Sequence, residues 1–226
     1  IVALHKSVHR GIDGMFGSLD CMHTYWKNCP YAFQGSFKGK EKKASIVLEA
    51  SSDHHSFFWH ASYGYAGTLN DINIINLSPL LNGFLDGDFE AREAGATPYN
   101  IGSEEFNKLF LLVDGIYPRY SRFVKAIKEP ISHNEKKFTS FQESARKDIE
   151  RAFGVLQIMW QCMKRPILLL DTQKIADMVA ACLILHNMCV SDRVMGDVFA
   201  RYNPAYKLKP VATKAVLQGL KGLTLA

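Results

Sequence analysis

The sequence predicts an α/β domain in which helices flank a mixed β-sheet. Three observations support this class. Strand-like apolar runs occupy the first third of the chain, a buried-strand pattern returns at residues 110–113, and two long helical patterns follow. Strands that are interrupted and then followed by helices are typical of a sheet covered by helices.

The N-terminal strands are predicted from runs of apolar and aromatic residues. Residues 16–20 predict a short strand that ends at an acidic residue, and residues 34–43, rich in Gly and Lys, predict a solvated loop or hairpin. Residues 44–51 (ASIVLEAS) and 57–63 (FFWHASY) are strand-like. The short polar link between these two runs predicts that they form a hairpin.

The middle of the chain combines a helix, a variable stretch and a buried strand. Residues 70–81 predict a short helix, and the Gly- and acid-rich residues 82–103 predict a surface excursion. The continuous apolar run 110–113 predicts a central strand that presents Asp114 at its C-terminal end. Residues 117–133 are expected to form a loop.

Two helices are predicted in the last third of the chain. Residues 138–163 carry apolar side chains at helical spacing on one face. This stripe consists of Phe138, Phe141, Ala145, Ile149, Ala152, Phe153, Leu156, Trp160 and Met163. Residues 174–190 predict a second, mostly buried helix, and residues 193–226 predict an irregular tail.

Composition limits the class of protein. The 226 residues are 47% hydrophobic and 22% charged, enough for one large domain, and the net charge of +5 permits a nucleic-acid partner. The five cysteines form no C-x-x-C pair, which argues against a zinc site or a disulfide framework and favours a reducing, intracellular compartment. Buried thiols are expected at Cys182 and Cys189. No apolar run is expected to span a membrane, so no membrane partner is predicted.

Three carboxylates are candidates for phosphodiester chemistry. Asp20 and Asp114 each follow an apolar run, and Glu150 lies at the margin of the apolar stripe on the long helix. Cleavage of a phosphodiester places negative charge on the entering and leaving oxygens, which two divalent metal ions stabilise. Mg²⁺ prefers a few carboxylates as ligands. The alternative is that these are ordinary surface charges and a strand-ending turn.

Two basic strips are candidates for contact with DNA phosphates. The first strip consists of Lys38, Lys40, Lys42 and Lys43, and the second of Arg119, Arg122, Lys125 and Lys128. A solvated loop is an equally good interpretation of the first strip. The second strip follows Asp114 closely, which favours contact with a DNA backbone.

Several histidines and tryptophans are expected to be structural. His186 is predicted to be a hydrogen-bonded core histidine and His23 a structural hydrogen-bonder. Trp26 and Trp59 are predicted to be core residues rather than platforms for base stacking. His54 and its neighbour are predicted to form a polar turn.

Five sequence blocks carry a family resemblance. They are GSLDCMH at 17–23, continuing to WKNCP at 26–30; GTLNDIN at 67–73; LVDGIYP at 112–118; RKDIERAFGVLQ at 146–157; and LILHNM at 183–188. In this order they resemble the conserved blocks of PIF/Harbinger-type DDE transposases. The 35 residues between Asp114 and Glu150 are also a spacing typical of DDE transposases.

The resemblance implies a fold, a chemistry and a setting. It implies an RNase H-like catalytic domain at residues 14–192, with residues 1–13 as a remnant or linker. Asp20, Asp114 and Glu150 would be the catalytic and metal-binding residues, and Asp71 would join them at the metal site. The implied cofactor is Mg²⁺ or Mn²⁺ and the implied reaction is cleavage and transfer of strands of double-stranded DNA in the nucleus. A separate DNA-binding partner protein and an oligomer are both compatible with it.

Two other functions stay open at this point. The first is a domesticated or decayed DNA-binding or regulatory protein with the same fold and no catalysis. The second is a phosphoesterase that acts on small nucleotides. Metal-dependent nicking of plasmid DNA separates the first from a transposase, and a preference for duplex DNA excludes the second.

Overall fold

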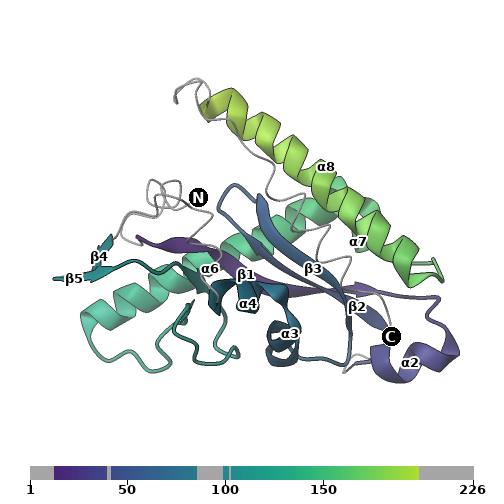
Figure 1. The fold of residues 1–226 in the computed structure, drawn as a ribbon, viewed down its shortest axis with the longest axis horizontal. Coiled ribbons are helices and arrows are strands. Elements are labelled where there is room, and N and C mark those ends of the chain that lie inside the picture. The colour runs from purple at the N-terminus through teal and green to yellow at the C-terminus, as the bar shows by residue number, and fades with distance from the viewer. Residues whose placement is uncertain (1–12, 40–41, 86–98, 102, 199–226) are drawn as a thin grey trace.

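The computed structural model describes residues 13–39, 42–85, 99–101 and 103–198 (Figure 1). A five-stranded sheet forms its centre, with the strand order β3-β2-β1-β6-β7. The strands are β1 (Met15–Tyr25), β2 (Ser45–Ser52), β3 (Phe58–Ala66), β6 (Phe110–Leu112) and β7 (Phe123–Val124). The first three are antiparallel, whereas β6 is parallel to β1 and β7 is parallel to β6. The predicted mixed sheet and the hairpin of β2 and β3 are therefore confirmed.

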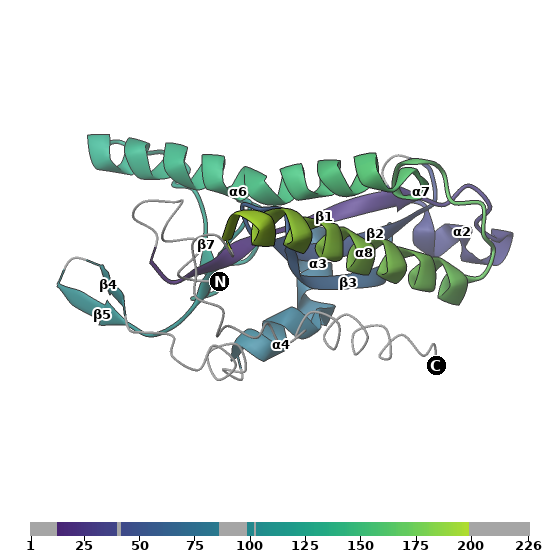
Figure 2. The same ribbon diagram turned by 90° about the horizontal axis from the view of Figure 1, so that it is seen from above.

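Helices cover both faces of the sheet. The helices are α2 (Tyr31–Phe37), α3 (Asp71–Leu77), α4 (Pro79–Leu85), α6 (His133–Met159), α7 (Gln161–Lys164) and α8 (Thr172–Val198). Helices α6 and α8 pack with β2 and β3 in one apolar cluster, and α3 and α4 pack on the opposite face. Figure 2 shows α6 and α4 on opposite sides of the sheet. The predicted α/β class with flanking helices is therefore confirmed.

A small ribbon stands apart from the main sheet. Strands β4 (Tyr99–Ile101) and β5 (Glu104–Phe106) pair with each other and with no other described strand. They lie at the end of the molecule opposite α2 (Figure 1). Part of the predicted excursion at 82–103 is thus regular structure, and residues 86–98 lie outside the described residues.

The long helix α6 begins earlier than predicted because a capping box starts it. The Ser132 hydroxyl accepts from the Glu135 amide at 3.2 Å, and the Glu135 carboxylate accepts from the Ser132 amide at 3.0 Å. The stripe predicted for this helix is buried from Ala145 to Leu156. The helix ends at Met159, so Trp160 and Met163 belong to the turn and to α7 rather than to α6.

Other expected boundaries were wrong. Strand β1 continues to Tyr25, and residues 31–37 form helix α2 instead of a loop. The predicted helix at 70–81 is two helices, because Ser78 is extended and Pro79 starts α4. The expected loop at 117–133 contains β7, and α8 runs on to Val198, past the expected start of an irregular tail. Residues 199–226 lie outside the described residues.

Helix α8 has one buried and one exposed face. Between Thr172 and Arg193 it is long and apolar enough to cross a membrane by length and composition, contrary to the expectation that no apolar run would be. Only 44% of its apolar window is buried in the protein, so the prediction of a mostly buried helix was wrong. Cys182 is buried as expected, whereas Cys189 is exposed, which corrects that expectation.

Candidate functional site

Asp20 lies in the middle of β1. The sequence predicted it at the end of this strand, and that prediction was wrong. Alternate residues of a strand share a face. The Ser18 hydroxyl donates to the Ala145 carbonyl of α6 at 3.0 Å, and the Gln157 amide of α6 donates to the Met22 sulfur at 3.2 Å. Asp20 lies between Ser18 and Met22 and therefore shares the face that α6 covers.

Glu150 lies on the helix that packs on this face of β1. It is on α6 between Ala145 and Gln157, two of the α6 residues that contact β1. Its side chain is 47% exposed, and one carboxylate oxygen lies 3.0 Å from the Arg146 guanidinium one turn earlier. Glu150 thus sits off the buried stripe of α6, as predicted, with Arg146 as its partner.

Asp114 follows the strand that lies next to β1. Ser18 pairs with Leu112 in parallel register, which is the last pair of β1 with β6, and Asp20 and Asp114 each lie two residues beyond this pair. Neighbouring strands are about 4.8 Å apart. Asp114 is exposed, and its carboxylate accepts from the Gly115 amide at 2.5 Å. Asp114 therefore lies just past the end of β6, the strand next to the one that carries Asp20.

The edge of β1 is open at this point. Among the described residues, β6 pairs with β1 only as far as Ser18, and the next partner on this side is Ile167, which pairs with Trp26. The backbone of Tyr25 and Lys27 bonds to Ile167, so by alternation Cys21 faces the same edge. The Cys21 amide donates to the Asp20 carboxylate at 2.8 Å. Asp20 thus lies at a gap between β6 and the segment around Ile167.

Asp71 contributes further negative charge from the opposite layer. It is the first residue of α3, directly after the cap residue Asn70, whose side chain accepts from the Asn73 amide at 2.8 Å. The pKa of Asp20 is raised to about 6, chiefly by burial. The Cys21 amide and the charge of Arg146 lower this pKa, and the negative charges of Asp71 and Glu150 contribute to raising it. Asp20, Asp71 and Glu150 are therefore close enough to interact electrostatically.

The donor set suits a hard cation, but the side chains are not arranged as a finished metal centre. Carboxylates are the ligands that Mg²⁺ and Mn²⁺ prefer. A half-buried carboxyl with two acidic neighbours is stabilised by a cation, which fits such an ion chemically. Within the described part of the chain, no three His, Cys, Asp or Glu side chains meet closely enough to hold an ion. Glu150 would have to leave Arg146 to complete the site.

The loop after Asp114 is fixed by residues that the sequence did not single out. The buried Tyr117 places its hydroxyl 3.6 Å from the Cys21 sulfur, and its amide donates to the Asp114 carbonyl at 3.2 Å. Burial raises the pKa of both Tyr117 and Cys21 well above the usual values, so both groups stay protonated. Cys21 and Tyr117 both belong to the sequence blocks around Asp20 and Asp114, but only the fold shows that their side chains are in contact.

The second basic strip is only partly available to DNA. The Lys125 ammonium donates to the carbonyls of Gly115 and Tyr117, at 3.1 and 2.7 Å, and so holds the loop after Asp114. Arg122 is 8% exposed and donates to the Leu109 carbonyl at 3.0 Å, which removes it from the surface that phosphates reach. Arg119 and Lys128 are exposed.

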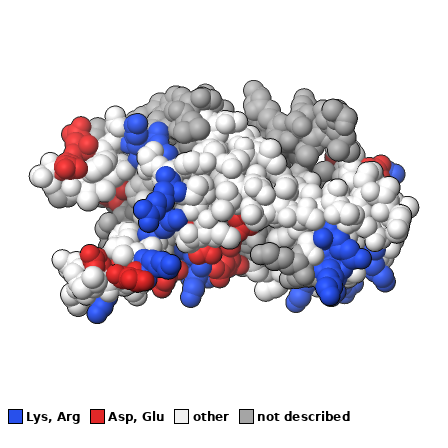
Figure 3. Space-filling model, turned by 90° about the horizontal axis from the view of Figure 1, so that it is seen from below, with Lys and Arg blue, Asp and Glu red and all other residues white. Residues whose placement is uncertain are grey.

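The first basic strip lies at the α2 end of the molecule. Lys38 is the C-terminal cap of α2, and Lys42 and Lys43 lead into β2; all three are exposed. Lys40 lies outside the described residues. Figure 3 shows Lys and Arg side chains gathered at this end of the molecule. The Lys43 ammonium lies 5.5 Å from the centre of the Tyr25 ring, so it lies near the C-terminal end of β1.

The residues expected to be structural are structural. His186 is fully buried and its Nε2 lies 2.8 Å from the Ser56 carbonyl oxygen, so Nε2 carries a proton and donates. Burial lowers the pKa of His186. His23 bonds to the Ser45 hydroxyl at 3.0 Å, and Trp26 is a core residue. Trp59 is half-buried and donates to Asp53 at 2.9 Å.

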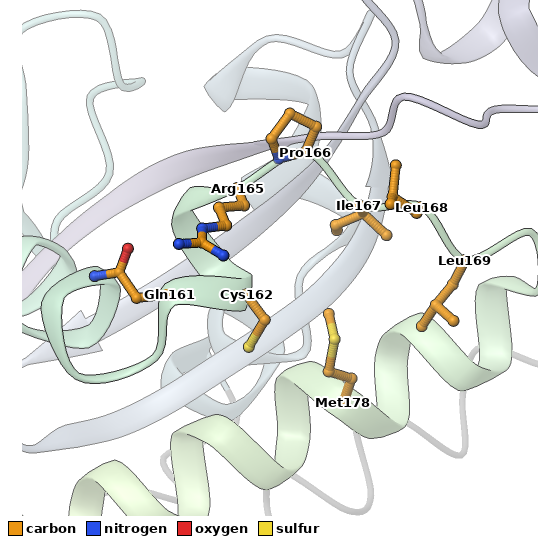
Figure 4. A pocket seen from close by; sticks show the side chains of 8 residues that line it. All are labelled: Gln161, Cys162, Arg165, Pro166, Ile167, Leu168, Leu169 and Met178. Atoms are coloured by element: carbon orange, nitrogen blue, oxygen red, sulfur yellow. The ribbon is translucent and has the colours of Figure 1, made fainter.

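A pocket of about 270 Å³ lies away from the acidic residues (Figure 4). It is formed where the segment between α6 and α8 meets Met178 of α8. Its lining is Gln161, Cys162, Arg165, Pro166, Ile167, Leu168, Leu169 and Met178. No candidate acidic residue lines this pocket, so the candidate site is the sheet edge and not the pocket.

The fold and these positions define an α/β protein with an acidic centre at the edge of a mixed sheet. The model of the family described as plant transposon protein matches residues 2–197. The chain belongs to this family, so it is a transposon-derived protein. No curated protein and no solved structure matches the chain.

Asp20→Asn should stabilise the metal-free protein at neutral pH. The folded Asp20 keeps its proton up to about pH 6, whereas the unfolded chain loses it near 3.8, so this residue lowers stability as the pH rises between these values. Asn removes that penalty, which is about 3 kcal/mol at pH 7, and its amide oxygen can still accept from the Cys21 amide. Urea unfolding in EDTA at pH 7 and at pH 3.5 measures this. An equal effect at both pH values would contradict it.

Proposed function

We propose that this protein is the catalytic domain of a PIF/Harbinger-type DDE transposase with an RNase H-like arrangement of its sheet. One observation carries the proposal. Asp20 and Asp114 each lie two residues beyond the last pair of two neighbouring parallel strands, and Glu150 lies on α6, the helix that packs on this face of β1. Membership of the plant transposon protein family supports a transposase origin for this arrangement. The proposed reaction is cleavage of double-stranded DNA, followed by transfer of the freed strand.

The proposed chemistry divides the work among these residues. Asp20 and Asp114 would hold divalent metal, Mg²⁺ or Mn²⁺, with Glu150 completing the site and Asp71 supporting it. Such a metal pair activates a water molecule and stabilises the entering and leaving oxygens of the phosphodiester. Once Glu150 has turned away, the Arg146 guanidinium would be free to contact the phosphates of the substrate. Tyr117 and Lys125 fix the loop that carries Asp114.

The proposed substrate follows from the exposed basic residues. Lys38, Lys42 and Lys43 at the α2 end, and Arg119 in the loop after Asp114, are exposed and would contact phosphates of duplex DNA without reading sequence. We also propose a nuclear location for this function. It is compatible with a separate DNA-binding partner protein and with assembly into an oligomer. Preference for plasmid DNA over free nucleotides would exclude a small-nucleotide phosphoesterase.

A second function is favoured by one specific contact. Glu150 is paired with Arg146 at 3.0 Å, an arrangement that needs no metal. A domesticated protein that binds DNA without cutting it would keep this pair permanently. The test is nicking of supercoiled plasmid in Mg²⁺ or Mn²⁺: nicked product supports the transposase, and its absence at saturating metal supports the non-catalytic protein.

DNA binding should weaken steeply with salt through the first basic strip. Changing Lys38, Lys42 and Lys43 together to Ala should lower the slope of log K against log salt by roughly 2–3, because each phosphate contact contributes about 0.9. Fluorescence anisotropy with a duplex of unrelated sequence measures the slope. Lys136→Ala with Lys137→Ala, a pair of lysines in the first turns of α6, is the matched control and should leave it unchanged. An equal loss of slope in both variants would argue against a specific role for the strip.

A further inference from the structure

A buried acidic side chain lies outside the proposed chemistry. Glu49 is in the centre of β2, is 0% exposed, and pairs with Cys21 on one side and Ser62 on the other. Its neighbours Leu48 and Ala50 belong to the core beneath α6 and α8. By strand alternation Glu49 therefore faces the opposite layer, where α3 and α4 pack.

Glu49 bonds to the junction between those two helices. Its Oε2 accepts from the Ser78 hydroxyl at 2.5 Å and lies 3.1 Å from His60 Nε2. Ser78 separates α3 from α4: its amide donates to the Ile75 carbonyl, and its hydroxyl also accepts from the Leu80 amide at 3.1 Å. A buried carboxylate is costly unless it is well paired. The pairing of Glu49 thus ties the end of α3 and the start of α4 to the sheet.

The position of this junction determines where α3 begins. Helix α3 has only seven residues, Asp71–Leu77, so about 10 Å separate its first residue from its last. Ile74 and Ile75 bury its inner face, and Asn76 accepts from the Tyr120 hydroxyl at 2.9 Å. With its last turn held by Ser78, its first residue is held as well. That residue is Asp71, whose charge acts on Asp20 and Cys21.

We propose that Glu49 is a positioning residue, which acts through Ser78 and α3 to hold Asp71 in the layer opposite α6, within electrostatic range of Asp20. This inference rests on the proposed function, because it gives Asp71 a role at a metal site. It assigns a function to a carboxylate that contacts neither metal nor DNA. It also explains why a fully buried acid is placed on the central part of β2, where an apolar residue would pack without an electrostatic cost.

The test is a double-mutant cycle in the full chain, read by Mn²⁺ affinity in titration calorimetry. Ser78→Ala should weaken Mn²⁺ binding roughly tenfold, the lower end of what losing an outer-shell partner costs. Ser78→Thr keeps the hydroxyl and should restore binding. Glu49→Gln keeps an acceptor oxygen without the charge and should fall between them. In an Asp71→Asn background, Ser78→Ala should have no further effect, because it acts only through Asp71.

A matched control separates positioning from general stability. Asp53 is a similarly buried carboxylate, which accepts from the amides of His55 and Phe57 in the turn between β2 and β3. Asp53→Asn should leave Mn²⁺ affinity unchanged, whatever its effect on the free energy of unfolding. Hydrogen exchange adds a readout without metal: Ser78→Ala should speed exchange of amides in residues 71–77 and not in β1.

The outcomes distinguish the two levels of inference. Wild-type Mn²⁺ affinity in folded Ser78→Ala, or an equal loss in the Asp71→Asn background, would overturn the positioning role. If the wild type binds no Mn²⁺, the proposed function fails. Faster hydrogen exchange confined to residues 71–77 of Ser78→Ala would then show that Glu49 and Ser78 anchor α3 without a role at a metal site.

Discussion

Asp114→Asn is expected to abolish nicking of plasmid DNA in Mg²⁺ or Mn²⁺ while leaving the fold and the DNA affinity at wild-type levels. The substitution keeps the size of the side chain but removes the negative charge that would hold a cation. Its effect on stability should be small, because Asp114 is exposed and the amide oxygen of Asn can still accept from the Gly115 amide. A loss of at least roughly 100-fold in nicking rate is expected for an essential electrostatic contact.

The comparison has two internal controls. Ca²⁺ should bind yet support little nicking, because its looser coordination does not impose the octahedral geometry that Mg²⁺ demands. Circular dichroism and duplex binding should be the same for both proteins. Equal nicking by wild type and Asp114→Asn would reveal a contaminating nuclease, and no nicking by either would favour the non-catalytic protein.

The largest loss of stability is expected from Phe153→Ala. Phe153 is 7% exposed, lies in the main apolar cluster, and stacks against Phe58 with ring centroids 5.9 Å apart. Removal of the ring leaves a cavity between α6 and the sheet and should lower the free energy of unfolding by about 3–5 kcal/mol. Urea denaturation measures it as a lower midpoint at unchanged slope.

Glu150→Ala is the matched control on the same helix, three residues away. Its side chain is 47% exposed, and a pair such as Arg146–Glu150 contributes about 0.3–0.5 kcal/mol. The free energy of unfolding should therefore change little. A loss above about 2 kcal/mol would instead identify Glu150 as a structural residue and count against its place at the metal site.

Local patterns predicted the elements whose sequences are unambiguous. The β2–β3 hairpin, the buried strand before Asp114 and the stripe of α6 each have a clear periodicity, and each was found. The start of α6 could have been predicted as well, because Ser132 and Glu135 have capping-box spacing. Helix α2 could not, since it contains a Gly and has no buried residue to produce an apolar stripe.

The acidic positions were predictable as candidates, but their partners were not. The end of β1 was missed because its second half mixes polar and apolar residues, which pack against segments far away in the sequence, such as Ile167. The charges of Arg122 and Lys125 are visible in the sequence. Their hydrogen bonds to the carbonyls of Leu109, Gly115 and Tyr117 depend on the tertiary structure of the loop after Asp114. The tie between Glu49 and Ser78 spans 29 positions and has no local signal.

The placement of Glu150 beside the apolar stripe of α6, and not in it, separates two kinds of selection on this gene. Ile149 and Phe153 are buried in the apolar core, whereas Glu150 and Asp114 are exposed. Under the proposed function, a copy released from selection for transposition could therefore lose nuclease activity through a single codon change and still yield a folded protein with its lysines in place. Such a copy could become a host DNA-binding protein directly, because no intermediate between the mobile element and the host gene would have to be unfolded.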